Sequence, residues 1–171
     1  MVLRDKNISL RRLEDEDIEP MARIANNKKI ADNLRDIFPF PYTEQHAIAF
    51  IDGTGREAPP VTFAIEYDGQ FCGVVGLVLQ TDVYRKSAEI GYWLGEPFWN
   101  KGIASIAVKL ITPYAFKTLN LSRIHAGVFA YNLPSMRVLE KNSFLKEGIF
   151  ERAIFKNGQL WDEHRYAKVN G

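Results

Sequence analysis

The chain has 171 residues, a length that fits one α/β domain over residues 1–171 better than two. Lys and Arg number 22 and Asp and Glu 21, which argues against a broad electrostatic nucleic-acid binder, because such a protein carries a strongly basic face. The single cysteine, Cys72, lies in an apolar run, so a disulfide framework is excluded and a buried thiol is expected. His46, His125 and His164 are far apart, and we expect no metal site.

The N-terminal third predicts one edge strand and two helices. Residues 7–13 alternate apolar and polar side chains, as an edge strand does. The acidic run 14–17 favours a helix start, because carboxylates are stabilised at the positive end of the helix dipole. A loop of aromatic residues and prolines follows at 37–42. Thr43 then caps a second helix that ends near Ile51.

The rest of the chain predicts a mixed sheet with further helices. Asp68-Gly69 is a hairpin signal between two apolar runs. Apolar residues recur at helical spacing after Gly102, and Asn132 opens a shorter helix that ends near Lys141. Further strands are expected over residues 61–67, 71–81, 87–94, 123–130, 144–155 and 160–169. This order predicts one α/β domain with helices on both faces of the sheet.

The most informative stretch is the strand at 88–94, followed by a loop and a helix that begins at Gly102. The first amides of a helix have no partner within it and point outward at the positive end of the dipole. Such an end binds phosphate, and Lys101 adds positive charge. The alternative is a plain strand-loop-helix in which Gly102 serves the turn.

Residues 99–104, Trp-Asn-Lys-Gly-Ile-Ala, resemble the pyrophosphate loop of GNAT acetyltransferases. Tryptophan at the first position is typical of the branch that acetylates the N-termini of ribosomal proteins. The same branch shows the strand motif of Ala88–Tyr92 and a helix start with Asn and Ser at the positions of Asn132 and Ser135. Other matches are Glu140, Lys141 and Phe144, the loop Phe38–Tyr42 and the turn Lys156–Gly158. The resemblance covers nearly the whole chain.

The resemblance implies a GNAT fold: a central, mostly antiparallel sheet of about seven strands, splayed at the cofactor site and flanked by about four helices. It also implies acetyl-CoA as the cofactor, bound partly by the main chain of the splayed strand as an added strand would be. The cofactor-binding residues are then expected to be Tyr92, Trp93, Leu94, Trp99, Asn100, Lys101, Gly102, Ile103, Ala104, Ser105, Asn132, Ser135 and Lys141.

Three residues depart from the family pattern. Ser143 stands where glycine is usual, and Ile106 stands where many members have glutamate. Leu139 takes the place of the tyrosine that protonates the leaving thiolate in many other GNAT enzymes. The branch that acetylates ribosomal proteins commonly lacks this tyrosine too, so this chain shares the departure at Leu139 with that branch.

Acetyl transfer requires a neutral amine, and amines are mostly protonated at neutral pH, so a base helps. Glu89 is the candidate base; alternatively it only hydrogen-bonds within the sheet and shapes the acceptor site. A main-chain amide near Trp93 or Leu94 is the expected donor to the oxyanion. Ser135 is the candidate proton donor to the thiolate, with Tyr131 as a weaker candidate, although Ser135 could instead bond locally to the backbone.

The acceptor is a primary amine, either a protein N-terminus or a small molecule such as a polyamine or amino sugar. Phe38, Phe40, Tyr42 and Trp161 are candidates to line its groove, unless they are core residues. We expect a monomer or a homodimer. The chain shows neither an apolar signal-peptide core nor about 18 uninterrupted apolar residues, which predicts a cytoplasmic protein without membrane contact.

Two other classes of protein stay open. A non-catalytic acyl-CoA-binding module would bind the cofactor without releasing thiol, and the absent tyrosine at Leu139 permits it. A nucleotide-binding α/β domain is the weaker alternative, because the sequence lacks GxxxxGK[ST] and lacks GxGxxG after its first strand.

Overall fold

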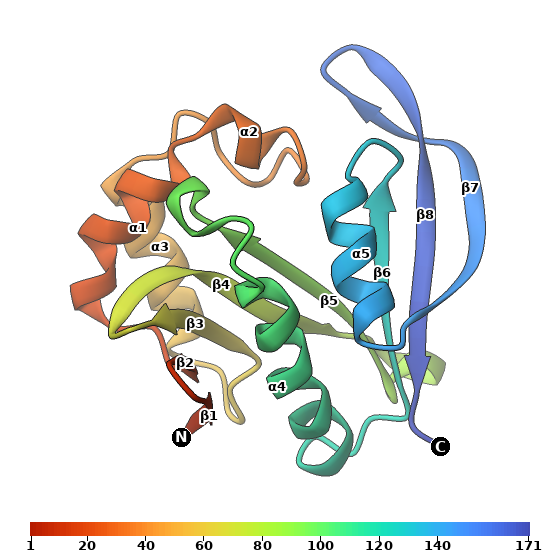
Figure 1. Cartoon of the computed structure of the whole chain (residues 1–171), viewed down its shortest axis with the longest axis horizontal. Helices are drawn as coiled ribbons and strands as arrows, with labels where there is room; N and C mark the ends of the chain where they lie inside the picture. Colours follow the sequence, from red (N-terminus) through yellow and green to blue (C-terminus); the bar gives the residue numbers. More distant parts are fainter.

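The computed structural model describes residues 1–171 and contains one eight-stranded sheet with five α-helices (Figure 1). The strands are β1 (Val2–Asp5), β2 (Ile8–Arg11), β3 (Thr62–Tyr67), β4 (Gln70–Leu79), β5 (Ser87–Leu94), β6 (Arg123–Phe129), β7 (Leu145–Lys156) and β8 (Gln159–Val169). The helices are α1 (Ile18–Ala25), α2 (Lys28–Ala31), α3 (Glu44–Thr54), α4 (Ile103–Lys117) and α5 (Leu133–Lys141).

The strands lie in the order β1-β2-β3-β4-β5-β6-β8-β7, and every neighbouring pair except β5 and β6 is antiparallel. The mostly antiparallel, mixed sheet predicted from the sequence is therefore confirmed. The sheet has one strand more than the seven expected, because the predicted edge strand is the second strand of a hairpin. Lys6, with φ of 54°, makes the tight turn of this hairpin.

Helix α2 is the one α-helix that the sequence did not predict. It is a single turn, and its start is capped by the side chain of Asn27, which accepts a hydrogen bond from the amide of Lys29. The cap predicted at Thr43 is confirmed, since its hydroxyl accepts from the amide of His46 at the start of α3. No helix in the structure is both long enough and apolar enough to cross a membrane.

Two hydrophobic cores lie on opposite faces of the sheet. The larger core packs α4 and α5 against residues such as Ile90 of β5 and Ile124 of β6, and the smaller one packs α1 and α3 against Val74 of β4 (Figure 1). Side chains along a strand point alternately to the two faces, so this packing assigns a face to each strand residue. Cys72 is fully buried, as predicted, and its Sγ donates to the carbonyl of Ile65.

Candidate active site

Strands β5 and β6 form a fork near the middle of the sheet. They pair in parallel only from Ser87 to Glu89 and from Arg123 to His125, and both strands continue beyond this point without pairing to each other. The splay implied by the family resemblance is therefore present. Main-chain groups along the open part of β5 are left without a neighbouring strand, a state that proteins usually avoid inside a sheet.

The pairing with β4 decides which main-chain groups of β5 face the fork. Gly95 donates to the carbonyl of Cys72, and Gln80 donates to the carbonyl of Ser87. Along an antiparallel strand, the amide and carbonyl of one residue point to one neighbouring strand and those of the next residue point to the other side. Because Ser87 and Gly95 bond to β4, the odd-numbered residues between them also bond to β4. Tyr92 and Leu94 consequently turn their amides toward the fork, whereas the amide of Trp93 turns to β4. Of the two oxyanion donors predicted, the geometry favours Leu94.

Helix α4 points its first amides into the same region. Gly102, at the position before the helix, has φ of 75°, a conformation open mainly to glycine. The bond from Ile106 to the carbonyl of Gly102 is the first of this helix, so the amides of Ile103, Ala104 and Ser105 have no partner within it. The indole of Trp99 donates to the carbonyl of Leu94 at 2.8 Å and ties the loop before α4 to β5.

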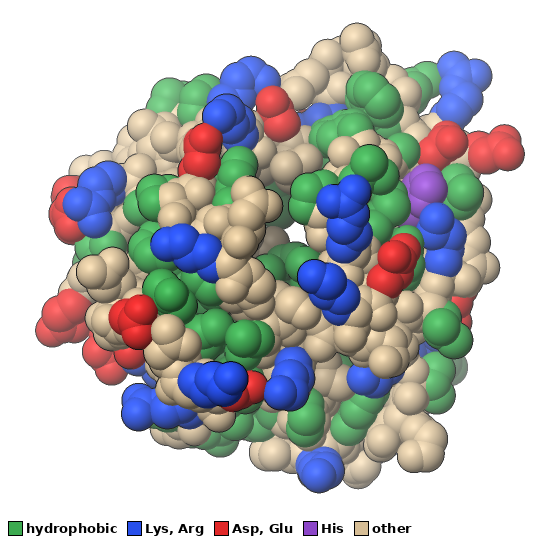
Figure 2. All heavy atoms as spheres, in the orientation of Figure 1, with side chains coloured by type: hydrophobic (Ala, Val, Ile, Leu, Met, Phe, Trp, Pro, Cys, Tyr) green, Lys and Arg blue, Asp and Glu red, His purple; other side chains and the backbone are tan.

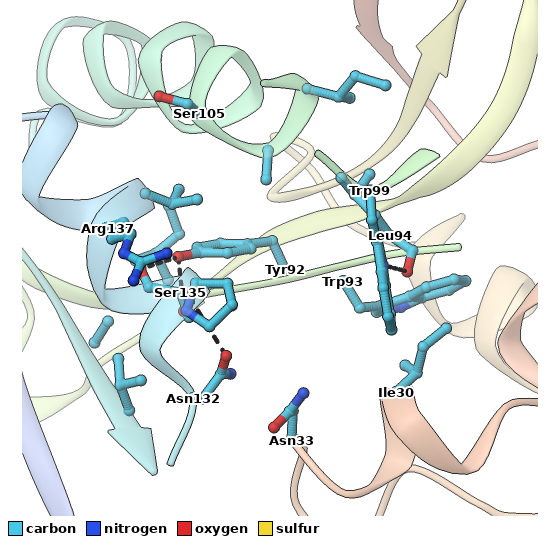
Figure 3. Close-up of a pocket in the computed structure, with 18 of the residues that line it drawn as sticks. Ile30, Asn33, Tyr92, Trp93, Leu94, Trp99, Ser105, Asn132, Ser135 and Arg137 are labelled. Carbon is cyan, nitrogen blue, oxygen red and sulfur yellow. Dashed lines mark hydrogen bonds between the residues drawn. The ribbon is translucent and has the colours of Figure 1, made fainter. Parts of the chain in front are cut away.

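Helix α5 forms the other side of the site, and one side chain of β5 reaches it. The side chain of Asn132 caps α5 by accepting from the amide of Ser135. The hydroxyl of Tyr92 lies 2.9 Å from Oγ of Ser135 and donates to its carbonyl at 3.2 Å (Figure 3). Burial raises the pKa of the Tyr92 hydroxyl well above its usual value, so it stays protonated.

A cavity of about 450 Å³ lies between these elements, within the range of small-molecule sites. All predicted cofactor-binding residues except Lys101 line it. The Lys101 ammonium group instead lies over the rings of Tyr67 and Phe98, at 5.5 and 5.8 Å from their centroids. Figure 2 shows Lys and Arg side chains beside the hollow, and Arg137 joins Lys141 in the cavity wall.

Several residues in the cavity wall were missed by sequence reasoning. Asn33 and Arg137 are the polar ones (Figure 3). Arg137 lies two residues after Ser135 on α5, so its charge near a predicted site was an available signal. Asn33 follows α2, and nothing in its sequence surroundings connects it with the fork. The other missed residues are Ile30, Leu34, Ile90, Gly91, Phe98, Ala126, Gly127, Val128, Pro134 and Val138.

Glu89 lies at the base of the fork, on the face away from α4. Its Oε1 accepts from Nη2 of Arg35 at 2.6 Å, and its side chain is 22% exposed. The cavity wall does not include it. A role for Glu89 as base therefore requires an acceptor that approaches from the face opposite α4, or a water molecule between the two.

The four aromatic residues predicted for the acceptor groove do not line the cavity. Tyr42 is buried in the smaller core, where its ring packs on Phe38. Phe40 is half exposed, and Trp161 packs edge-on against Tyr131. None of the four lies in the cavity wall, and their role in binding an acceptor stays a prediction.

Two of the three departures from the family pattern have structural consequences. Ser143 has φ of 63°, which explains why glycine is usual at its place, because this conformation is strained for other residues. Leu139 is fully buried in the larger core, so no hydroxyl reaches the cavity from that position. Ile106 packs against the same core.

The sequence matches the family described as acetyltransferase (GNAT) domain over residues 7–145. YjcK of Bacillus subtilis, described as an N-acetyltransferase, is 42% identical over 102 residues, 60% of this chain and 56% of that protein, so the chain spans about half of that relative. YdaF of Bacillus subtilis, described as a ribosomal N-acetyltransferase, is 32% identical over 92% of this chain and 88% of that protein.

Spermidine N(1)-acetyltransferase of Escherichia coli is 30% identical over 90% of this chain and 81% of that protein. Among solved structures, Mycobacterium smegmatis RimJ in complex with CoA-disulfide superposes with a TM-score of 0.84 at 26% identity, covering 99% of this chain and 86% of that one. The chain belongs to the GNAT family of N-acetyltransferases. The branch that the sequence resembles is also supported, since YdaF and RimJ are among its relatives.

Proposed function

We propose that the chain binds acetyl-CoA in the cavity between α4 and α5 and transfers the acetyl group to a primary amine. The observation that carries this proposal is the fork, in which the unpaired main chain of β5 lies beside the free amides at the start of α4. Such amides suit phosphate groups, and the basic side chains of Arg137 and Lys141 add charge at the cavity wall. The single sheet, which includes both ends of the chain, supports one domain.

The side chains around the fork can serve each step of the transfer. The amine loses one proton, its nitrogen bonds to the thioester carbon, the carbon–sulfur bond breaks, and the thiolate gains one proton. We assign to Glu89 the acceptance of the proton from the amine, directly or through water. The hydroxyl of Ser135 donates the proton to the thiolate. The amide of Leu94, which faces the fork, suits the oxyanion. Tyr92 holds the hydroxyl of Ser135 in place.

The proposed acceptor is a primary amine, and the relatives of this chain favour two kinds of amine. YdaF is described as acting on a ribosomal protein and the Escherichia coli relative as acting on spermidine. Both reactions need the same attack on a thioester and differ only in what surrounds the amine. A peptide N-terminus and a polyamine are therefore the first acceptors to test.

The test combines cofactor binding with turnover. Titration calorimetry with CoA is expected to give saturable heat, and incubation with acetyl-CoA plus an alanine-headed peptide or spermidine is expected to release free thiol. No heat with CoA on folded protein would overturn the assignment of the cavity. Tight CoA binding without thiol release on any amine, unchanged by Glu89→Gln, would instead favour a non-catalytic acyl-CoA-binding module.

A further inference from the structure

The turn between β7 and β8, which carries the motif Lys156–Gly158, lies against the end of α2. Asn157 donates through Nδ2 to Oδ1 of Asp32 at 2.9 Å, and the hydroxyl of Tyr131, after β6, donates to the carbonyl of Asp32. Helix α2 and this turn stand at the same end of the sheet (Figure 1). The contacts therefore join the end of α2 to the strands on the β6 side of the fork.

Lys156 is the only buried basic residue of the chain, with 7% of its surface exposed. Its Nζ donates to Oδ1 of Asp36 at 2.8 Å, and the side chain of Asp36 is 84% exposed. A buried ammonium group is costly without a partner, and Asp36 is the one residue to which this group donates. Because the stem of Lys156 is already fixed by burial, forming the pair costs it little further side-chain entropy. The lysine therefore holds the aspartate in place.

The segment Arg35–Ile37 has few other contacts that fix it. Before it, Asn33 and Leu34 donate through their amides to carbonyls of α2, whereas the amides of the segment donate to no main-chain carbonyl. After it, the ring of Phe38 packs on Trp93 at 5.7 Å. A segment with so few main-chain hydrogen bonds depends on its side-chain contacts for its position. The pair between Lys156 and Asp36 is the contact that ties the middle of this segment to the sheet.

Arg35, the neighbour of Asp36 in this segment, reaches the candidate base. Its Nη2 donates to Oε1 of Glu89 at 2.6 Å, although most of the arginine side chain is exposed. A long exposed side chain keeps one position only when the backbone that carries it is fixed. The pair orients the carboxylate of Glu89 and leaves its Oε2 without a partner in the protein.

We propose that Lys156 is a positioning residue for the transfer reaction: through Asp36 it holds Arg35 where the guanidinium group orients the carboxylate of Glu89. This inference rests on the proposed function, because it supposes that Glu89 accepts the proton of the amine. When the pair with Asp36 is lost, Arg35 leaves Glu89 for part of the time. The carboxylate then turns among several positions, and few of them suit proton transfer.

The test removes the pair from either side. Lys156→Met removes the ammonium group and keeps the length of the stem, and Asp36→Asn removes the charge at an exposed position that folding does not depend on. Each is expected to lower kcat for an alanine-headed peptide about fivefold, the effect of one lost hydrogen bond. The Kd for CoA is expected to stay unchanged, because Asn33 and Leu34 remain bonded to α2. Asp36→Glu keeps the carboxylate and is expected to keep the wild-type kcat. An unchanged kcat in either Lys156→Met or Asp36→Asn would overturn the inference.

A double-mutant cycle tests whether Lys156 acts through Arg35. Arg35→Ala is expected to lower kcat about tenfold, the effect of losing a hydrogen bond between charged groups. Adding Lys156→Met to Arg35→Ala is expected to lower kcat no further, because the two residues act in one chain of contacts. A further fivefold loss, of about 1 kcal/mol, would show that Lys156 acts independently of Arg35 and would refute the positioning role.

The matched control is Lys146→Met, the same exchange on the same strand. The ammonium group of Lys146 lies over the ring of Tyr166, 5.6 Å from its centroid, and has no contact with the segment after α2. This variant is expected to keep the wild-type kcat. A loss equal to that in Lys156→Met would assign the effect to any change in β7 and contradict the inference.

A measurement without turnover separates this inference from the proposed function. Backbone order parameters of the segment Arg35–Ile37, measured by NMR, are expected to fall from about 0.85 in wild type to below about 0.6 in Lys156→Met and Asp36→Asn. Such a fall without thiol release in wild type supports the positioning of the segment and refutes the transferase. Thiol release in wild type with unchanged order parameters in both variants supports the transferase and refutes the positioning role. Neither thiol release nor a fall refutes both.

Discussion

The two halves of the sheet on either side of the fork are covered differently. Strands β1 to β5 have α1 and α3 on one face and α4 on the other, whereas β6, β8 and β7 have α5 on one face only (Figure 1). Phe150 and Phe155 of β7 are more than half exposed. Both halves contribute to the cavity wall, the doubly covered half through β5 and α4 and the open half through β6 and α5, and the open half leaves one face of its strands uncovered.

One ion pair from each half differs in burial. Arg11 of β2 donates two hydrogen bonds to Asp17, which is almost fully buried, and a third to Glu66. Arg123 of β6 pairs with Glu147 at the surface of the open half. A paired charge inside a protein becomes costly when its partner is removed, whereas an exposed pair contributes little. The comparison therefore predicts unequal effects of the same substitution in the two halves.

Arg11→Ala tests this contrast and has the largest expected effect. It leaves the carboxylate of Asp17 buried and unpaired, and we expect the free energy of unfolding to fall by about 3–5 kcal/mol. Arg123→Ala, the matched control, is expected to cost less than about 1 kcal/mol. Urea unfolding measures both values. Equal losses in the two variants would contradict the contrast between the halves.

Ala104→Glu tests the wall that α4 contributes to the cavity. A carboxylate at the first turn competes with phosphate for the free amides, so we expect the Kd for CoA to rise about 100-fold, or ~2.7 kcal/mol. Stability should change little, because a carboxylate suits a helix start. Ala49→Glu on exposed α3 is the control, and calorimetry with CoA is the measurement. A Kd within threefold of wild type, about 0.7 kcal/mol, would show that phosphate lies elsewhere.

Tyr92→Phe tests the contact that joins the halves across the fork. It removes the hydroxyl that contacts Ser135 and keeps the ring. One lost hydrogen bond of ~1 kcal/mol predicts a five- to tenfold lower kcat, with the Kd for CoA unchanged. Tyr84→Phe on an exposed side chain is expected to have no effect. A lower CoA affinity with normal kcat would mean that Tyr92 supports the cavity and not Ser135.

Cys72 gives the smallest predicted effect, in the doubly covered half. Burial raises the pKa of this thiol from 9.0 to about 12. The unfolded chain loses the proton above pH 9 while the folded protein keeps it, so stability falls as the pH rises, by about 1 kcal/mol between pH 9 and 10. Urea unfolding at both pH values measures this loss. Cys72→Ala should make the decrease smaller by that amount, because buried tyrosines such as Tyr92 contribute the remainder; an equal decrease in the variant would assign all of it to other groups.

The cavity wall on the α4 side of the fork was predictable because its residues are close in sequence. Leu94, Trp99 and Ala104 belong to one strand-loop-helix unit, and local turn geometry brings them together. Asn132 and Ser135 form a second such unit. Lys101 lies in the same loop, but the sequence did not indicate that its ammonium group lies over the rings of Tyr67 and Phe98, and its role in cofactor binding stays a prediction.

By itself the sequence determined the family, most of the succession of strands and helices, the capped start of α3 and half of the residues of the cavity wall, because these depend on local patterns and short motifs. Only the tertiary structure decided the other side of the fork. Arg35 of the loop after α2 reaches Glu89 of β5 because the chain folds this loop over the strand, and Glu163 of β8 lies against Gly127 because the chain places β8 beside β6. Contacts between residues so far apart leave no periodic or local signal in a single sequence.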